Sequence, residues 1–198
     1  MKNTKNALLF ALSVMLCFAV ASCGSSGGAA AAGSEFGEGI PFVGELNIFS
    51  DVNDGGDSTI EMEEIEVDGI TAWRITGNVT TAFQYGFVGW MYEPDEATLE
   101  ALKTARAISF MYVGDGQRMT VKYRISTVTD HAFHEYNFTG EAGVVDRLEV
   151  PIRFFQQPSW GAGTRMVQAN AVDISWQTHE SWRPGPFEIT IWDVRIHP

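Results

Sequence analysis

Residues 118–126 read Arg-Met-Thr-Val-Lys-Tyr-Arg-Ile-Ser, and the pattern of this stretch predicts the fold class. Met119, Val121, Tyr123 and Ile125 are apolar, whereas the residues between them are polar or charged. A period of two is typical of a β-strand with one buried face and one face turned to water or a ligand. We therefore predict a strand here, with its cationic side chains on the polar face.

Similar alternation continues along most of the chain, in short runs separated by Gly, Pro and Asp. Strands are predicted at Glu45–Phe49, Ile60–Val67, Thr71–Thr76, Gly86–Tyr92, Ala107–Tyr112, Arg118–Ser126, His134–Phe138, Asp146–Ile152, Ala169–Trp176 and Phe187–Ile196. Residues 93–106 follow a helical pattern instead, although one helical turn and a loop would fit as well. Short strands without β-α-β alternation predict an all-β fold, an antiparallel β-sandwich in one domain.

The N-terminus has the pattern of a targeting segment. Two lysines precede an apolar run of 15 residues, 7–21, which is too short for a comfortable membrane span. Small residues then lead to Cys23, and a Gly- and Ser-rich stretch follows. This pattern resembles a bacterial lipoprotein signal, which implies cleavage before Cys23 and acyl chains, such as palmitate, on that residue. The alternative is an ordinary secretory signal in which Cys23 is incidental.

These features divide the chain into three expected parts. Residues 1–22 are the signal peptide, residues 23–44 are the lipidated cysteine and a flexible tether, and residues 45–198 are the folded domain. We expect the protein in a bacterial cell envelope, on the periplasmic or cell-surface side, held to a membrane through lipid only.

Charge and cysteine content exclude several function classes. The 198 residues contain 13 Lys and Arg against 25 Asp and Glu, a formal charge of −12, which becomes −14 once Lys2 and Lys5 leave with the signal. A nucleic-acid partner is excluded because it requires a cationic surface. Cys17 and Cys23 are the only cysteines, so a disulfide scaffold and thiol chemistry in the mature protein are excluded as well.

Aromatic and charged residues on predicted strands supply the candidate binding site. The candidates for ligand contacts are Trp90, Tyr92, Lys122, Arg124, His134 and Tyr136. Sugar rings pack their C–H faces on flat aromatic side chains, and their hydroxyl groups need charged or amide partners. This mixture therefore suits a carbohydrate. The pattern leaves open whether the face shared by His134 and Tyr136 lies in the core or in the binding site.

Motifs for metal or catalytic chemistry are mostly missing. The acidic loop 51–57 begins like an EF-hand, but the twelfth position is Met62, where a bidentate Glu is needed. Histidines 131, 134 and 179 lack the spacing of a zinc site. No Gly-x-Ser-x-Gly or phosphate-binding glycine motif occurs. A glycosidase-like pair of carboxylates stays open as a weaker alternative, because the sequence does not reveal their spatial separation.

Four stretches resemble the CIA30 (complex I intermediate-associated protein 30) family. They are residues 48–59 (IFSDVNDGGDST), 107–116 (AISFMYVGDG), 150–161 (VPIRFFQQPSWG) and 185–194 (GPFEITIWDV). The same outline is shared with family 11 carbohydrate-binding modules. The resemblance covers about residues 45–197 and implies a galactose-binding-like jelly roll with a concave face on one sheet.

The resemblance also implies structural calcium, a frequent feature of these domains. Asp51 and Asp193 are the matching oxygen ligands in this chain. The sequence departs from the family pattern in two places, and the first of these concerns a calcium ligand. Trp192 stands where the first Asp of a closing pair is expected, which puts one ligand in doubt, and Pro151-Ile152 reverses the usual order.

The leading functional hypothesis is a lipoprotein with a non-catalytic binding module for an oligo- or polysaccharide. A protein-binding scaffold or assembly factor of CIA30 type is the alternative. A glycoside hydrolase-like enzyme is a weaker third possibility.

Overall fold

The structure is a computed structural model that describes residues 35–198. The predicted signal peptide, Cys23 and residues 24–34 of the predicted tether lie outside the described residues. Among residues 35–198, no helix is both long enough and apolar enough to span a membrane.

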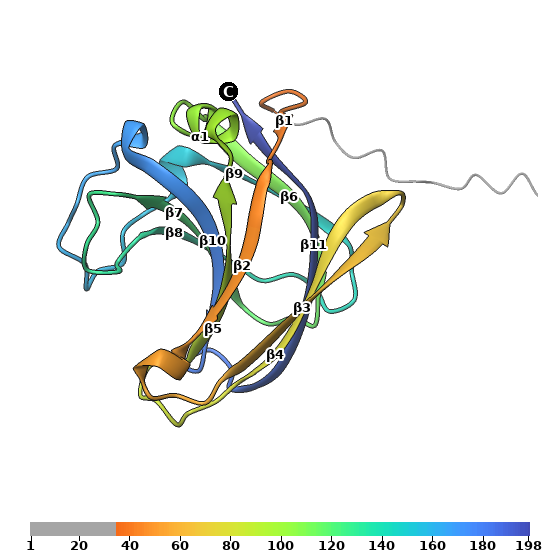
Figure 1. The fold of residues 1–198 in the computed structure, drawn as a ribbon, viewed down its shortest axis with the longest axis vertical. Coiled ribbons are helices and arrows are strands. Elements are labelled where there is room, and N and C mark those ends of the chain that lie inside the picture. The colour runs from red at the N-terminus through yellow and green to blue at the C-terminus, as the bar shows by residue number, and fades with distance from the viewer. Residues whose placement is uncertain (1–34) are drawn as a thin grey trace, which may run out of the picture. The chain divides into compact units, whose positions relative to one another are not determined.

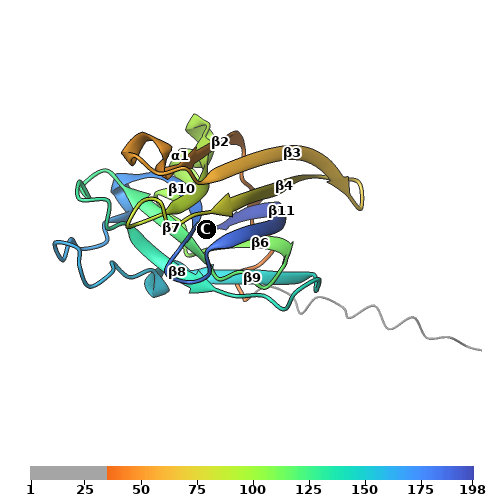
Figure 2. The ribbon, with the colours of Figure 1, turned by 90° about the horizontal axis from the view of Figure 1, so that it is seen from below.

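Two antiparallel sheets pack face to face around one core (Figures 1 and 2). The six-stranded sheet has the order β3-β4-β11-β6-β9, with β1 added beside β11. Its strands are β1 (Ile40–Pro41), β3 (Thr59–Val67), β4 (Ile70–Val79), β6 (Ala107–Gly114), β9 (Asp146–Pro151) and β11 (Gly185–His197).

The five-stranded sheet has the order β2-β5-β10-β7-β8. Its strands are β2 (Gly44–Ser50), β5 (Phe87–Pro94), β7 (Met119–Ile125), β8 (His134–Phe138) and β10 (Ala171–His179). The predicted all-β antiparallel sandwich is therefore confirmed, and each predicted strand overlaps an observed one. Three short 3-10 helices lie in the loops, at Asp51–Asp54, Ile152–Phe154 and Gln168–Asn170.

Aromatic side chains fill the space between the sheets. Trp176 of β10 stacks on Trp90 of β5, with ring centroids 6.0 Å apart and ring planes 8° apart. Phe110 of β6, in the opposite sheet, meets the Trp176 ring edge to face at 5.4 Å. Truncating a buried ring of this size costs about 3–5 kcal/mol in typical cores. This cluster therefore fixes which face of β5, β6 and β10 points inward.

One α-helix is present among the described residues, α1 at Glu96–Leu102, between β5 and β6. The Asp95 carboxylate caps its first turn by accepting a hydrogen bond from the Thr98 backbone N–H at 2.7 Å. The buried Leu102 ends it, and the Tyr123 hydroxyl donates to the Leu102 carbonyl at 2.5 Å. The helix is shorter than the predicted segment 93–106 because β5 continues through Pro94.

The folded domain begins before residue 45, the expected start. Ile40 of β1 pairs with Ile196 of β11, and the Phe42 side chain is buried in the core. A strand of two residues has no period that a sequence pattern could reveal. Residues 40–44, which the sequence assigned to the tether, therefore form part of the sandwich.

Candidate functional site

The alternation of side chains along β7 determines which of them point away from the core. Val121 and Tyr123 are fully buried between the sheets. Because side chains alternate along a strand, Lys122 and Arg124 lie on the opposite, outer side of the five-stranded sheet. Figure 2 shows this side facing away from the six-stranded sheet.

The strand register extends this surface across all five strands. We define the β7 face as the outward side chains Glu45, Asn47, Phe49, Phe87, Gly89, Met91, Glu93, Arg118, Thr120, Lys122, Arg124, Glu135, Asn137, Asp173, Ser175, Gln177 and His179. Its short polar side chains, such as Thr120 and Ser175, are buried, whereas Lys122 and Gln177 are partly exposed. The longer side chains of the face therefore cover the short ones.

Hydrogen bonds between neighbouring strands hold the polar groups of the β7 face. The Lys122 ammonium donates to Gln177 Oε1 at 2.5 Å. The Thr120 hydroxyl donates to Asn137 Oδ1 at 2.7 Å. These contacts fix donors and acceptors before any ligand arrives, which lowers the entropy lost on binding.

Arg124 and Asp173 form an ion pair at one end of the face. Arg124 Nη1 lies 3.2 Å from Asp173 Oδ2. The Arg124 guanidinium also stacks over the Phe133 ring, 4.7 Å from its centroid, and donates to the Met91 sulfur at 3.4 Å. Asp173 is only 3% exposed, and its Oδ1 has no partner among the described residues.

Aromatic rings lie at the other end of the β7 face. Phe49 packs against Phe87 with ring centroids 6.2 Å apart. The Phe49 ring also lies over Gly89, where an added Cβ would clash with it and with the Trp176 carbonyl. Glycine is therefore required at this position. The half-buried Phe49 ring thus occupies the space above Gly89, in a largely polar surface.

His179 and Trp182 continue this end of the face. Their rings are 3.8 Å apart between centroids, and the Arg118 guanidinium lies 4.7 Å from the centroid of the Trp182 ring. The Ser181 hydroxyl contacts His179 Nδ1 at 2.6 Å. Trp182 thus contacts the Arg118 guanidinium and the His179 imidazole, next to the β7 face.

Burial shifts the pKa values of several groups here. It raises the pKa of Asp173 to about 6, against the lowering influence of Arg124. Burial, together with the positive charges of Lys122 and Arg118, lowers the pKa of His179 to about 4. Burial also lowers the pKa of Lys122. Charged side chains on this face are therefore partly removed from water.

The structure brings only two of the six predicted ligand residues to this face, Lys122 and Arg124. Trp90 is 0% exposed and stacks on Trp176 in the core, so the expected stacking of Trp90 on a sugar is corrected. Tyr92 also points inward and meets the Trp176 ring at 6.1 Å. Both residues lie on the inward face of β5, because the large rings fill the space between the sheets.

His134 and Tyr136 also lie on the inward side of their strand. His134 is buried, and Tyr136 packs against the core. Glu135 and Asn137 take the outward positions of β8 instead. His134 and Tyr136 are therefore not available for ligand contacts on the β7 face.

The sequence analysis missed other residues of the face, chiefly Phe49, Phe87, Asp173, Gln177 and His179. Polarity could have identified Asp173, Gln177 and His179, since they alternate with apolar residues in 171–179. For Phe87 no such signal exists, because both faces of β5 carry large apolar side chains. Phe49 of β2 follows the apolar Ile48, so residue type does not reveal which of the two points outward.

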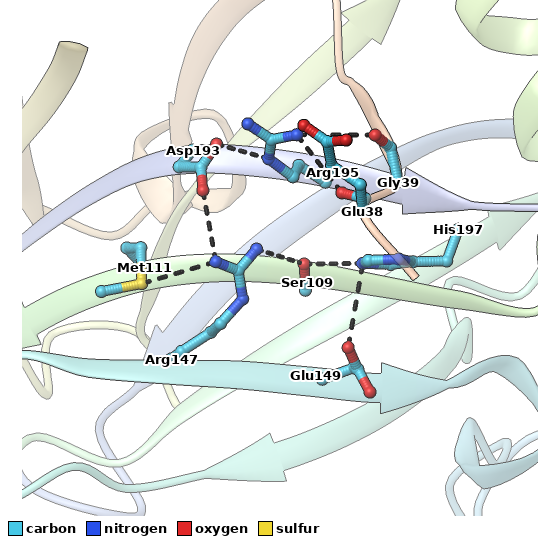
Figure 3. A network of polar contacts seen from close by, with 9 residues as sticks. All are labelled: Glu38, Gly39, Ser109, Met111, Arg147, Glu149, Asp193, Arg195 and His197. Atoms are coloured by element: carbon cyan, nitrogen blue, oxygen red, sulfur yellow. Dashed lines mark hydrogen bonds and ion pairs between the residues drawn. The ribbon is translucent and has the colours of Figure 1, made fainter. Parts of the chain in front are cut away.

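The two predicted metal ligands are occupied by protein donors. The buried Asp51 carboxylate accepts from the Ser58 backbone N–H at 3.0 Å, from the Ser58 hydroxyl at 2.7 Å and from the Phe87 N–H at 3.2 Å. Asp193 lies between the guanidinium groups of Arg147, at 3.3 Å, and Arg195, at 2.6 Å (Figure 3).

These residues do not fit a calcium site. Calcium needs six to eight oxygen ligands, whereas the nearest partners of both carboxylates are hydrogen-bond donors. Within residues 35–198, no group of three or more His, Cys, Asp and Glu side chains is placed to hold a metal ion. Asp193 instead lies at a register shift of β11 with a φ of 48°, a conformation that Asp tolerates better than most residues.

Figure 3 also shows Ser109, His197 and Glu149 on the outer side of the six-stranded sheet. Ser109 Oγ contacts His197 Nε2 at 2.8 Å, and the Glu149 carboxylate lies 3.9 Å from the same nitrogen. A catalytic triad needs the serine and the carboxylate on different ring nitrogens. Ser109 and His197 are also fully buried, so this group stabilises the sheet and does not resemble a nucleophilic site.

Comparisons with known proteins agree with the fold. The family model "Complex I intermediate-associated protein 30 (CIA30)" matches residues 39–191. The chain is similar to the family 11 carbohydrate-binding module of the cellulosomal cellulase Lic26A-Cel5E of Clostridium thermocellum, with a TM-score of 0.54 and 16% identity. That match covers 80% of this chain and 92% of the module. None of the curated proteins matches the chain.

A second similar structure is the family 11 module from Clostridium thermocellum in complex with a β-1,3-1,4-mixed-linked tetrasaccharide. Its TM-score is 0.52 at 16% identity, covering 80% of this chain and 92% of that one. The structure of CtCBM11 determined in solution has a TM-score of 0.54 at 14% identity, covering 85% of this chain and 97% of that one. At such identities the likeness establishes the jelly-roll-like fold.

The Asp51 network predicts a stability effect. In Asp51→Ala, the Ser58 and Phe87 donors lose their acceptor, so we expect the free energy of unfolding to fall by about 3 kcal/mol. Asp54→Ala, an exposed change in the same turn, should alter it by about 0.5 kcal/mol or less. Urea denaturation measures both. Because donors of the protein already satisfy the Asp51 carboxylate, adding or chelating calcium should leave the midpoint unchanged, and a calcium-dependent rise would contradict this account.

Asp173 predicts a pH dependence. Its folded-state pKa of about 6 exceeds the ordinary value of 3.8, so between these pH values the folded protein binds more protons than the unfolded chain. The stability of the wild type relative to Asp173→Asn should therefore fall as the pH rises from about 4 to about 6, by up to about 3 kcal/mol. Denaturation curves at several pH values test this, and parallel stability profiles for the two proteins would refute it.

Proposed function

This chain belongs to the CIA30 family, and from that premise and the chemistry of the β7 face we propose that it is a non-catalytic binding protein whose ligand is a carbohydrate. The observation that carries the proposal is one surface that combines the Phe49 and Phe87 rings with fixed polar groups. Those polar groups include the Lys122–Gln177 hydrogen bond and the Arg124–Asp173 ion pair.

The chemistry of a sugar matches this surface. The C–H face of a pyranose ring packs on an apolar aromatic ring, as Phe49 offers beside Gly89. The hydroxyl groups at the ring edge both donate and accept, so they need amides and charged groups within reach. Gln177 and Asn137 supply amides, and Lys122 and Arg124 supply charged donors. The binding role of family 11 modules of the same fold supports this proposal.

A protein partner is the second candidate function. The family match favours it, because the name of the family refers to a protein associated with an assembly intermediate of complex I. Crosslinking in intact envelopes separates the two candidates. A stoichiometric protein partner, together with no binding to any glycan, would favour the scaffold.

We further propose that Cys23 carries the lipid anchor of a bacterial envelope protein, on the periplasmic or cell-surface side. Support comes from the apolar run at residues 7–21, the small residues before Cys23 and the Gly- and Ser-rich stretch after it. Two or three acyl chains bind a membrane stably without a spanning helix.

Changes on the β7 face should weaken glycan binding. In Phe49→Ala the sugar loses its apolar platform, and in Arg124→Ala it loses a charged donor, so each should weaken binding by about tenfold or more. Arg74→Ala is the matched control, because Arg74 forms a similar ion pair, with Glu188 at 3.0 Å, on the outer side of the opposite sheet. Titration calorimetry with soluble plant, algal and bacterial oligosaccharides measures these affinities. If the wild type binds none of the oligosaccharides in the panel, a glycan ligand is rejected.

Replacing Cys23 should release the protein from the membrane. Without its thiol, Cys23→Ser cannot receive the diacylglycerol, so we expect it in the soluble fraction of lysed cells while the wild type sediments with membranes. Cys17→Ser, inside the predicted signal, should leave the wild-type fractionation unchanged. Immunoblots of the two fractions measure the distribution. Membrane retention of Cys23→Ser would contradict the anchor.

A further inference from the structure

Lys122 is a partly buried cation without an ion pair. Its ammonium donates to Gln177 Oε1 at 2.5 Å, and among residues 35–198 no carboxylate lies within 4.0 Å of it. The other lysine of the described chain, Lys103, differs in this respect, because it forms an ion pair with Glu100 at 2.7 Å. An ammonium that has lost part of its hydration and lacks a counter-ion attracts an anion strongly.

Charged groups of both signs act on Lys122. Burial is the main cause of its lowered pKa, the negative charge of Glu135 acts in the opposite direction, and Arg124, two residues along the same strand, lowers the pKa. Lys122 and Arg118 together lower the pKa of His179, after burial. Lys122 is thus close enough to feel the charge of Arg124, and His179 is close enough to feel the charges of Lys122 and Arg118.

The acids of the β7 face offset the charge of Lys122 only in part, because none of them forms an ion pair with it. Asp173 is held by Arg124, and burial raises its pKa to about 6. Glu135 lies opposite Lys122 on β8, and burial raises its pKa also, against the influence of Lys122 and Arg118. Glu45 and Glu93 lie at the Asp173 end of the sheet, on β2 and β5. Lys122 and Arg118 thus lie at the part of the face where Glu135 is the neighbouring acid, and the Glu135 carboxylate forms no ion pair with either of them.

We propose that the β7 face selects an oligosaccharide that carries an anionic group, a carboxylate or a sulfate, and that this group binds at Lys122. The inference rests on the proposed function and narrows its ligand class. Lys122 donates to Gln177 of β10, and the register partner of Gln177 on β5 is Gly89, which the Phe49 ring covers. Phe49 and Lys122 therefore lie on either side of Gln177, so an oligosaccharide can place a ring on Phe49 and its anion on the ammonium. At physiological ionic strength the Debye length is about 8 Å, so the distant acids that give the chain its charge of −12 are screened.

Matched pairs of glycans test the proposal by titration calorimetry on the whole protein. One pair is an oligogalacturonate and its neutral methyl ester, and the other is a sulfated galactan oligosaccharide and its desulfated form. We expect at least one anionic member to bind about tenfold or more tightly than its neutral twin, since a charge-assisted hydrogen bond is worth about that much. The pair that shows the difference identifies the anion as carboxylate or sulfate.

Two variants locate the effect. Lys122→Met keeps the length of the side chain and removes its charge, so it should abolish the preference for the anionic twin. Its midpoint of thermal unfolding should not fall, because burial disfavours the charged form of Lys122. Lys103→Met should retain the preference, because Lys103 is paired with Glu100 at the end of α1 and is not part of the β7 face.

The pKa of His179 gives an independent readout, followed by NMR titration of its ring protons. An anion bound at Lys122 should raise this pKa from about 4, because negative charge stabilises the imidazolium. No change of the pKa in the presence of a bound anionic glycan would place the ligand elsewhere and overturn the inference.

The remaining outcomes separate the inference from the proposed function. Equal affinity for both members of every pair would overturn the inference and leave a carbohydrate ligand in place. Binding of no glycan, charged or neutral, would overturn both. Polyglutamate that binds as tightly as the anionic glycans would also overturn the inference, because the face would then recognise acidic peptides.

Discussion

The contact between Trp176 and Trp90 is the constraint on which the β7 face depends. These rings stack in the core, and Phe110 from the opposite sheet closes on Trp176 edge to face. Since side chains alternate along a strand, an inward Trp176 turns Ser175 and Gln177 outward. A slip of β10 by one residue would turn Trp176 outward and Asp173 and Gln177 inward. The direction in which Trp176 points therefore determines both the packing of the core and the side chains of the β7 face.

The same constraint explains the electrostatics of the surface. A sheet with one face in a dry core leaves only its other face for charge, and here that face gathers Lys122, Arg124 and Asp173 close together. Neighbouring side chains remove these groups partly from water, which shifts the pKa of Asp173 upward and that of Lys122 downward. Groups held in this way interact more strongly with a ligand than fully hydrated surface charges do.

The sequence predicted most of the fold because alternation is strong where the two faces of a strand differ in polarity, as in 118–126. That difference also placed Lys122 and Arg124 on the outer side. It failed for β5, where Phe87 and Met91 on one face are as apolar as Trp90 on the other. In such a strand only the tertiary packing decides which ring is buried.

The motifs that carry the family resemblance have structural roles in this chain. Asp51 holds the turn after β2 through Ser58 and the Phe87 N–H. Asp115, in the Gly-Asp-Gly motif, accepts from the Gln117 N–H at 2.9 Å and from Arg183 at 2.7 Å in the turn after β6. A carboxylate that matches the family pattern is therefore better evidence for the fold than for a metal site. The interactions of these side chains with neighbouring strands were not visible in the sequence.

The pairing of β1 with β11 has a consequence for how such a domain combines with other chains. Ile40 lies opposite Ile196, so the chain enters and leaves the sandwich at adjacent strands of the six-stranded sheet, away from the β7 face. A domain with neighbouring entry and exit points can be inserted into a surface loop of another protein without being pulled apart. The fold is thus suited to act as a portable module in different host architectures.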